Sequence, residues 1–310
     1  MKFGIHNPSF VFDADPYNAF EGLKAKAQWA ENHGFAWFSV MDHLFQIPWV
    51  GASEEPFIEG WTALTALAAV TTRIRLATLV SSVAYRNPAL LAKMASGVDV
   101  ISRGRMTLGI GAGWFDTEYR QYGWEFPEKP AVRIRQMEEA VKLILLMWSE
   151  KRATFHGKFF HVEDAILEPK PVQKPRPPVM IAGGGEQMTL RVVARLGDMC
   201  NVGGTPADVK RKFDILRGHC GTEGRDYAEI EKTNIMSLLL ARTDTALAAK
   251  RERLGVGTGF MGFAGTVAAA TDLIGQYRDA GVDMVITSIA KNDIETMELL
   301  ASEIVPKFDR

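Results

Sequence analysis

The sequence predicts an α/β protein that folds as a (β/α)8 TIM barrel with one inserted segment. Strand and helix patterns alternate along the whole chain, with eight strand-like segments that are each followed by a helical one. Strands such as Val179–Ala182 and Met284–Ile289 are apolar on both faces, which is typical of a buried parallel sheet. An open, doubly wound sheet would also satisfy this order. Eight repeats with no linker and no break in composition favour a single barrel over residues 1–310.

The strands are expected at short apolar runs, and the helices where apolar residues recur every three or four positions. The expected strands are 2–7, 37–42, 74–82, 105–113, 178–184, 199–204, 230–242 and 283–290. The expected helices are 17–33, 60–71, 88–102, 131–148, 186–196, 245–253, 266–280 and 294–306, and another begins at Thr205-Pro206-Ala207-Asp208. The segment of about 149–177 is rich in proline, lysine and aromatic residues, and we interpret it as an excursion that holds a hairpin. Residues 254–264 are expected to form a glycine-rich link.

Composition excludes several classes of protein. The 310 residues carry a formal net charge of −1, whereas a dedicated nucleic-acid-binding protein is usually basic. The most apolar runs, at 61–70 and 141–148, are too short to span a bilayer. Cys200 and Cys220 form neither a CxxC pair nor a metal-ligand spacing. We therefore expect a cytoplasmic protein that binds neither nucleic acid nor membrane.

Gly109, Gly111 and Gly113 end the fourth strand-like segment. A dinucleotide-binding turn has the spacing G-x-G-x-x-G and opens directly into a helix. Here the spacing is G-x-G-x-G, and no helix is expected before about Ala131, so this fingerprint is absent. The glycines fit a strand end at which the backbone passes close to something flat or bulky. A tight barrel turn without a ligand is the alternative.

The chemistry of such a barrel lies at the C-terminal ends of its strands. Polar, glycine and aromatic residues gather at these ends, and this clustering predicts a ligand site there. The residues concerned are His6 and Asn7, Asp42 and His43, Thr78 to Ser82, Gly111 to Trp114, Gly183 to Gln187, Asn201 to Gly204, and Thr287 and Ser288.

Three successive glycines, Gly183, Gly184 and Gly185, precede an expected helix. Successive backbone N–H groups and a helix N-terminus both favour an anion, and late barrel loops recurrently bind phosphate. We therefore interpret the stretch through Glu186 and Gln187 as a phosphate-binding loop. Glu186 would repel a phosphate if it pointed at one, and a flexible turn before a helix is the alternative.

Asp42 and His43, at the end of the second strand, are the candidate acid–base residues. A histidine titrates near neutral pH, and an adjacent carboxylate can tune it or bind a polar edge. A structural role is the alternative for a single histidine. The sequence contains no H-E-x-x-H spacing and no G-x-S-x-G elbow, so we predict neither a metal site nor a serine nucleophile. Trp49 and Trp114 lie in strand-end loops, where they are placed to wall a pocket for a planar ligand.

Six short segments occur together along nearly the whole chain: Phe38-Ser-Val-Met-Asp-His-Leu44, Arg86-Asn-Pro88, Gly109-Ile-Gly-Ala-Gly-Trp-Phe-Asp-Thr-Glu-Tyr119, Gly157-Lys-Phe-Phe160, Pro169-Lys-Pro-Val-Gln-Lys-Pro175 and Pro178-Val-Met-Ile-Ala-Gly-Gly184. In this combination the chain resembles the bacterial luciferase-like monooxygenase family, and specifically its branch that uses the deazaflavin coenzyme F420. Each segment is weak by itself, and the combination is specific.

The resemblance implies a barrel whose strand ends carry the cofactor ring, with the cofactor phosphate near Gly183–Gln187. It also implies a non-proline cis peptide in the third strand, by position at Thr78–Leu79, which would support the ring. Gly111 and Gly113 would contact the cofactor, Asp42 would lie at the polar edge of its ring, and His43 would stand near the reactive ring carbon. Members of this family frequently pair, so a homodimer is implied as well.

The function implied by the resemblance is an F420-dependent oxidoreductase that transfers a hydride between the deazaflavin and a small organic substrate. His43 would take or give the proton, and Trp49 and Trp114 would shape the substrate side. Arg191 and Arg195 are placed to reach the polyglutamate tail of F420, although each could equally be a solvated helix residue.

One departure from the family matters for the substrate. In the glucose-6-phosphate dehydrogenases of the F420 group, a catalytic glutamate follows the glycines of the fourth strand, whereas Trp114 stands at that place here. A sugar phosphate is therefore not expected, and no second acid is assigned. The alternatives are an FMN-dependent monooxygenase with a separate cofactor reductase, a non-catalytic flavin- or deazaflavin-binding protein, and a metal-dependent hydrolase, which the missing ligand spacing weakens.

Overall fold

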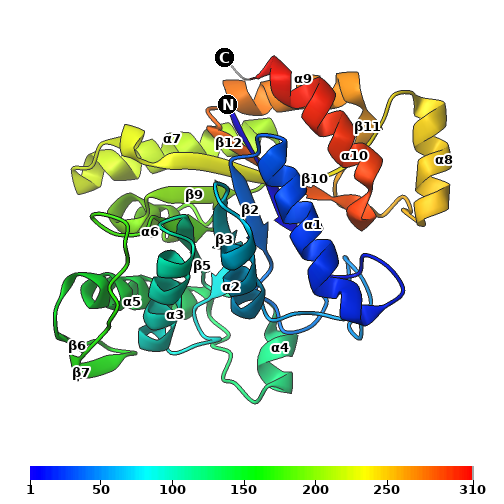
Figure 1. Ribbon diagram of the computed structural model, residues 1–310. Helices are drawn as coiled ribbons and strands as arrows, with labels where there is room; N and C mark the ends of the chain where they lie inside the picture. The colour runs from blue at the N-terminus through cyan, green and yellow to red at the C-terminus, as the bar shows by residue number, and fades with distance from the viewer. Residues whose placement is uncertain (309–310) are drawn as a thin grey trace.

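Eight parallel strands close into a barrel in the computed structural model, which describes residues 1–308 (Figure 1). The barrel strands are β1 (Lys2–Asn7), β2 (Trp37–Val40), β3 (Arg75–Thr78), β5 (Met106–Gly111), β8 (Val179–Ala182), β9 (Met199–Val202), β10 (Glu231–Ala241) and β12 (Met284–Ile289). Each strand pairs in parallel with the next in this order. The last strand, β12, pairs with β1 and closes the ring, which confirms the predicted TIM barrel.

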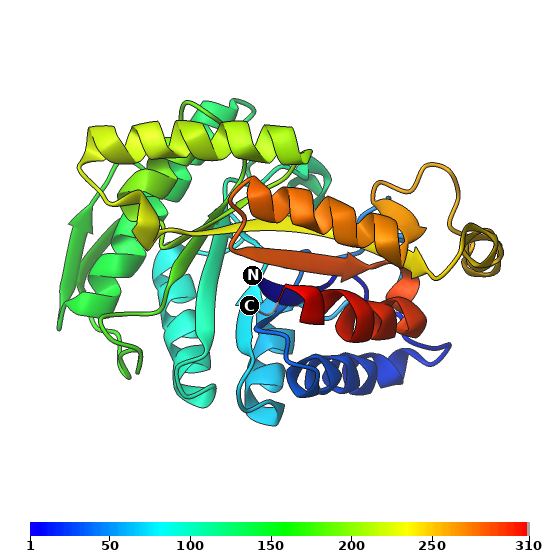
Figure 2. The ribbon, with the colours of Figure 1, turned by 90° about the horizontal axis from the view of Figure 1, so that it is seen from above.

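Helices surround the strands on the outside, as the view in Figure 2 shows. They are α1 (Ala19–Asn32), α2 (Gly60–Val70), α3 (Pro88–Ile101), α4 (Asp116–Gln121), α5 (Pro130–Ser149), α6 (Thr189–Leu196), α7 (Pro206–Glu223), α8 (Asp244–Leu254), α9 (Val267–Asp279) and α10 (Ile294–Leu299). The capping box expected at the start of α7 is present, because the side chains of Thr205 and Asp208 each accept a hydrogen bond from the other's backbone N–H. No helix within residues 1–308 has both the length and the apolar character needed to cross a membrane.

The segment of about 149–177 leaves the barrel between α5 and β8. Its strands β6 (Ala153–His156) and β7 (His161–Ala165) pair antiparallel, so the expected hairpin is present. A further short strand, β11 (Phe263–Thr266), pairs with the end of β10. The prediction that residues 254–264 are only a link was therefore wrong at its C-terminal end.

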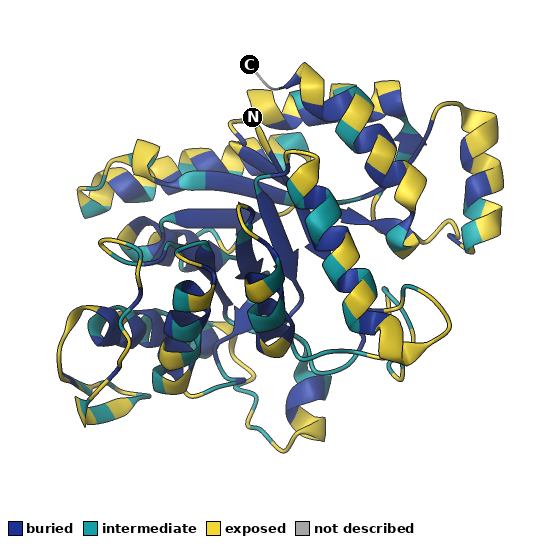
Figure 3. Ribbon diagram, in the orientation of Figure 1, coloured by how far each residue is buried: buried dark blue, intermediate teal, exposed yellow. Residues whose placement is uncertain are grey.

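The interior of the barrel is packed at the end where the strands begin. Trp37, Ala77, Met180, Met199, Met284 and Ile286 form a buried cluster there. Arg75 closes this end, because its guanidinium lies 5.5 Å from the Trp37 ring and binds the Glu231 carboxylate with two nitrogens. Met1 and Phe308 lie at the same end, where the Met1 ammonium donates to Phe308 O at 2.9 Å. Figure 3 shows the barrel strands almost entirely buried. The opposite end, called the mouth below, is formed by the C-terminal ends of the strands, where barrels of this type carry their sites.

The third strand is interrupted just below the mouth. Residues 74–82 were expected as one strand, but β3 ends at Thr78 and the chain resumes as β4 (Ser81–Ser82), which pairs with β5. A cis peptide bond joins Leu79 to Val80, so the position predicted for it, Thr78–Leu79, was wrong by one residue.

The glycines of β5 make room for this interruption. A Cβ at Gly109 would overlap the carbonyl oxygen of Thr78, and one at Gly111 would lie 2.9 Å from Val80 Cγ2. The expectation that the backbone here passes close to a bulky neighbour is therefore confirmed, and the neighbour is the third strand itself.

We predict that Gly109→Ala lowers the free energy of unfolding by about 1–3 kcal/mol, because the added methyl group overlaps rigid backbone. Gly97→Ala in α3 is the matched control, because no atom lies within 4 Å of its Cβ position, and it should stabilise by about 0.5–1 kcal/mol. Urea unfolding measures both changes. Equal effects of the two substitutions would contradict the close approach of β3 and β5.

Candidate active site

A histidine–carboxylate pair lies at the mouth, between β2 and α4. His43 follows β2, and its Nδ1 lies 2.7 Å from Oε2 of Glu118, which is fully buried. The second carboxylate oxygen accepts a hydrogen bond of 2.6 Å from the backbone N–H of Leu44. Because an ionised carboxylate can only accept, Nδ1 of His43 carries a proton and donates it to Glu118. Its other ring nitrogen, Nε2, is then the atom available for proton transfer.

Tyr85 completes this arrangement from the loop before α3. Its hydroxyl donates to the same carboxylate of Glu118. Burial, and then the negative charge of Glu118, raise the pKa of Tyr85 well above its ordinary value. The phenol therefore stays protonated and acts as a donor, so three N–H or O–H groups hold a carboxylate that has no contact with water.

Glu118 is the site residue that sequence reasoning missed. It lies on α4, a short helix in a region where no helix was expected before about Ala131. No second acid was assigned from the sequence, because Trp114 stands where the resemblance places a glutamate. Asp116 and Glu118, two acidic residues directly after a glycine-rich strand end, are a helix-start signal that would have indicated α4.

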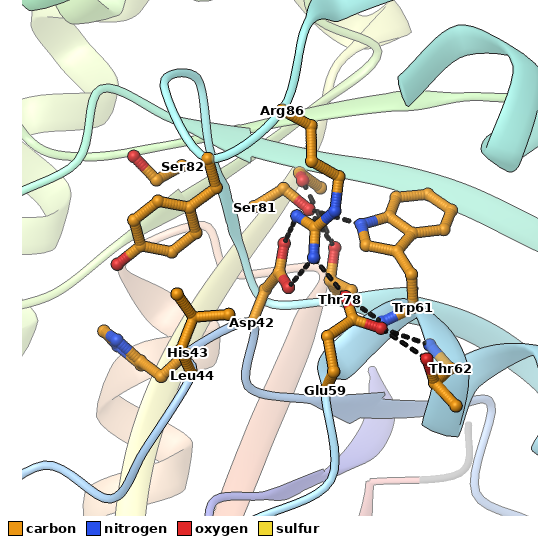
Figure 4. A network of polar contacts seen from close by, with 12 residues as sticks. Asp42, His43, Leu44, Glu59, Trp61, Thr62, Thr78, Ser81, Ser82 and Arg86 are labelled. Carbon is orange, nitrogen blue, oxygen red and sulfur yellow. Dashed lines mark hydrogen bonds and ion pairs between the residues drawn. The ribbon is translucent and has the colours of Figure 1, made fainter. Parts of the chain in front are cut away.

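Asp42, the neighbour of His43, points to the other side of the chain. Its carboxylate oxygens accept hydrogen bonds of 2.7 and 2.8 Å from Arg86, which also binds Glu59 (Figure 4). Glu59 in turn caps α2 by accepting from the backbone N–H groups of Trp61 and Thr62. Although burial lowers the pKa of Arg86, the Asp42 charge outweighs it and raises that pKa. Both oxygens of Asp42 are thus engaged, and a cofactor edge at this residue would have to share them.

Further polar contacts hold the predicted cofactor-binding residues of the third strand. Thr78 is fully buried, and its Oγ1 lies 2.9 Å from Ser81 Oγ, which also accepts from the Trp61 indole at 2.9 Å. Leu79 is half-buried and is therefore more accessible than Thr78. Gly113 has φ 79°, and a Cβ there would overlap the Tyr119 hydroxyl and Ser82 Oγ. The glycine therefore lets β5 turn outward into Trp114.

Trp49 and Trp114 are brought together at the mouth. Their ring centroids lie 4.9 Å apart with an interplanar angle of 30°. The His43 ring meets Trp114 edge-on at 5.6 Å. The structure thus joins three residues that the sequence placed in two separate loops.

The loop Gly183–Gln187 lies beside the loop after β9. Gly183 has φ 131°, which favours glycine, and its N–H donates to Asn201 O at 3.0 Å. Lys212 of α7 lies over this loop, because a Cβ at Gly184 would be 2.8 Å from its Nζ. Glu186 forms an ion pair with Arg211. The negative charge of Glu186 is therefore compensated, so it would repel a nearby phosphate less.

One detail of this loop differs from expectation. Helix α6 begins at Thr189, three residues later than predicted, and hydrogen-bonded turn residues separate it from the glycines. Gln187 is exposed. Arg191 and Arg195, for which either contact with a polyglutamate tail or a solvated helix position was expected, both pair with Glu223, at 2.8 and 2.9 Å.

Two buried basic side chains lie beneath the mouth. Nδ1 of His6 lies 3.0 Å from Ser39 Oγ, and burial, together with the nearby Lys26 and His43, lowers the pKa of His6 to about 3. Burial lowers the pKa of Lys26 to about 7, and its ammonium donates to the side chains of Asn7 and Asn292 at 2.9 and 2.7 Å.

Other parts of the described structure offer less for chemistry. A depression of about 960 Å³ lies at the opposite end of the barrel, but two lysines that line it, Lys2 and Lys232, each pair with a carboxylate at 3.0 Å. Within residues 1–308, no three His, Cys, Asp or Glu side chains gather in a way that could hold a metal ion.

The fold and the site together define a barrel protein whose mouth carries a histidine bonded to a buried carboxylate, a stacked pair of tryptophans and a glycine-rich loop beside a lysine. Residues 1–294 match the model of the luciferase-like monooxygenases, and the chain belongs to this family. Members of the family are oxidoreductases, and they include both F420-dependent and FMN-dependent enzymes.

The chain is similar to relatives of both kinds. The chain is 32% identical over 213 residues to the F420-dependent glucose-6-phosphate dehydrogenase of Kineococcus radiotolerans, a match that covers 66% of this chain and 57% of that protein. It is 29% identical over 243 residues to the pyrimidine monooxygenase RutA of Stutzerimonas stutzeri, covering 77% and 66%. The solved structure of an F420-dependent secondary alcohol dehydrogenase in complex with an F420–acetone adduct superimposes with a TM-score of 0.81 at 21% identity, covering 99% of both chains. At that identity the likeness establishes the shared fold.

We predict that His6 makes the protein sensitive to acid. A histidine whose pKa is lowered from 6.5 to about 3 by folding is protonated first in the unfolded chain, so stability falls as the pH drops below 6.5. Between pH 6.5 and 5 the free energy of unfolding should decrease by on the order of 2 kcal/mol more in the wild type than in His6→Asn. Urea unfolding at a series of pH values measures this difference. His161→Asn, at an exposed position, is the control and should follow the wild type; parallel profiles for all three proteins would refute the prediction.

Proposed function

We propose that this protein is an oxidoreductase that uses coenzyme F420 to exchange a hydride with a small organic substrate. The observation that carries this proposal is the His43–Glu118 pair, which leaves one imidazole nitrogen available beside half-exposed aromatic rings at the mouth. The relative named as an F420-dependent dehydrogenase supports the choice of cofactor.

The residues at the mouth fit a flat cofactor with an anionic tail. Val80, which packs against Gly109 and Gly111, and its neighbour Leu79 are half-buried and would offer an apolar surface to the ring. The glycines at 183–185 present main chain to an anion, and the Lys212 ammonium lies directly beside Gly184. This cation was not part of the sequence-based hypothesis, and it strengthens the phosphate interpretation.

When bound, coenzyme F420 supplies or takes up a hydride, so the protein must supply orientation and move a proton. His43 is suited to this, because Glu118 fixes its ring and its tautomer and leaves Nε2 to donate to, or accept from, a substrate oxygen. Glu118 is a positioning residue, since its carboxylate is buried and bonded to protein donors. The stacked Trp49 and Trp114 rings would shape the substrate side of His43.

We predict that His43→Ala lowers turnover about 10²–10⁴-fold, because the proton would have no positioned donor or acceptor. Glu118→Gln should lower kcat with little change in KM, because the imidazole loses its fixed tautomer while the substrate contacts are kept. Turnover is followed by deazaflavin absorbance with an alcohol or carbonyl compound selected by screening. His33→Asn, at an exposed helix end, is the control and should match the wild type. Unchanged kcat in both site variants, with cofactor binding intact, would remove the pair from the mechanism.

We predict that Lys212 recognises the cofactor phosphate. Lys212→Met should weaken F420 binding about tenfold, because a charge-assisted contact is lost, but should leave binding of the phosphate-free deazaflavin riboside unchanged. Lys210→Met is the matched control on the same helix, since Lys210 pairs with Asp214 at 2.7 Å. Calorimetric titration of the wild type and both variants with the two ligands measures all six affinities. Equal loss for both ligands would mean that Lys212 acts on the loop rather than on the phosphate.

The second candidate function is that of an FMN-dependent monooxygenase supplied by a separate reductase. The relative named as a pyrimidine monooxygenase, which this chain matches over 77% of its length, favours it. Parallel titrations with F420 and FMN, in oxidised and reduced forms, separate the two functions. Tighter binding of reduced FMN, with substrate-dependent oxygen uptake, would replace our proposal with this one.

A further inference from the structure

Three aromatic side chains form an exposed surface at the mouth, which we call the aromatic platform: Trp49, Trp114 and Phe115. The Trp114 ring lies 4.9 Å from Trp49 and 5.1 Å from Phe115. Although the two tryptophans contact each other, 55% of Trp49 and 50% of Trp114 remain exposed to solvent. Large aromatic side chains usually bury most of their surface, so a stacked pair left open to water marks a binding surface.

The aromatic platform borders the acid–base histidine. The His43 ring lies 5.6 Å from Trp114 and 5.9 Å from Phe115, edge-on to both. Since Nδ1 of His43 is bonded to Glu118, a ligand on the platform meets the Nε2 side of the imidazole. The platform is therefore placed to hold the part of a substrate next to the reacting group.

The charges around the platform disfavour an anion. No lysine or arginine occurs between Lys26 and Arg73, a stretch that includes the whole loop carrying Trp49 and also Glu54 and Glu55. The segment 106–119, which carries Trp114, contains no basic residue either. Three arginines near these segments are already engaged: Arg86 pairs with Asp42, Arg120 pairs with Asp116, and Arg133 donates to the carbonyl oxygens of Gly113, Pro127 and Glu128. A carboxylate or phosphate seated here would lose water without gaining a cation, which is costly.

We propose that the aromatic platform binds a planar aromatic or conjugated ring compound that carries no negative charge. This inference rests on the proposed function and specifies its substrate class. The rings of Trp49 and Trp114 supply stacking, and the acidic loop excludes anionic analogues of the same shape.

A pair of nearly isosteric probes tests the charge discrimination. 2-Naphthamide is neutral and 2-naphthoate is its anionic counterpart, and neither is a hydride donor or acceptor under these conditions. Calorimetric titration of the full-length protein, with and without bound F420, gives the affinity for each probe. We expect the amide to bind at least about tenfold more tightly, because the carboxylate finds no cation.

Variants of the platform test where the probe binds. Trp49→Ala and Trp114→Ala should each weaken 2-naphthamide binding about tenfold, whereas Trp49→Phe and Trp114→Phe should retain most of it because a ring is kept. Tyr17→Ala is the control, since Tyr17 is an exposed aromatic residue outside the platform, in the segment before α1. Thermal unfolding verifies that each variant is folded.

Equal or tighter binding of 2-naphthoate would overturn the inference, as would unchanged binding of 2-naphthamide in the alanine variants or no binding in any state. The proposed function fails by different results, namely that F420 does not bind, or that reduced FMN binds more tightly and supports substrate-dependent oxygen uptake. The failure of the inference about the aromatic platform can therefore be distinguished from the failure of the proposed function.

Discussion

The buried carboxylate of Glu118 is the constraint on which the site depends. A carboxylate without access to water is stable only when hydrogen-bond donors surround it, and here the donors come from His43, the Leu44 backbone and Tyr85. The donors follow β2 and precede α3, and Glu118 itself belongs to the connection after β5. One charge therefore ties three strand-end loops together, and the imidazole has the orientation it needs only while all of them are in place.

A second network of charged residues lies on the other side of the end of β2. Asp42 and His43 are neighbours in the chain and point to opposite sides, so one strand end is held by Arg86 on one side and by Glu118 on the other. Arg86 also binds Glu59, whose carboxylate caps α2. The end of β2 is therefore fixed by buried, bidentate and directional contacts rather than by packing alone, as the proton-transfer role that we propose for His43 would require.

The sequence predicts the barrel well because its signals are local. Alternating apolar strands and helices, the Thr205–Asp208 capping box and the hairpin of the excursion all follow from residues close in the chain. What it does not predict arises from contacts between distant segments. The pairing of His43 with Glu118 spans 75 positions, and Lys212 reaches Gly184 from another helix. The sequence predicts that the backbone at the β5 glycines passes close to a neighbour. Only the fold shows that this neighbour is the interrupted third strand.

The same geometry explains the position of Trp114, the residue that follows the glycines of the fourth barrel strand. The turn at Gly113 directs residue 114 outward, where it stacks on Trp49 and meets the edge of His43. Glu118, four residues further on, is buried and holds the imidazole through Nδ1. The half-exposed surface beside His43 is therefore aromatic rather than charged, which is the basis of our proposal that a substrate is recognised there by ring stacking.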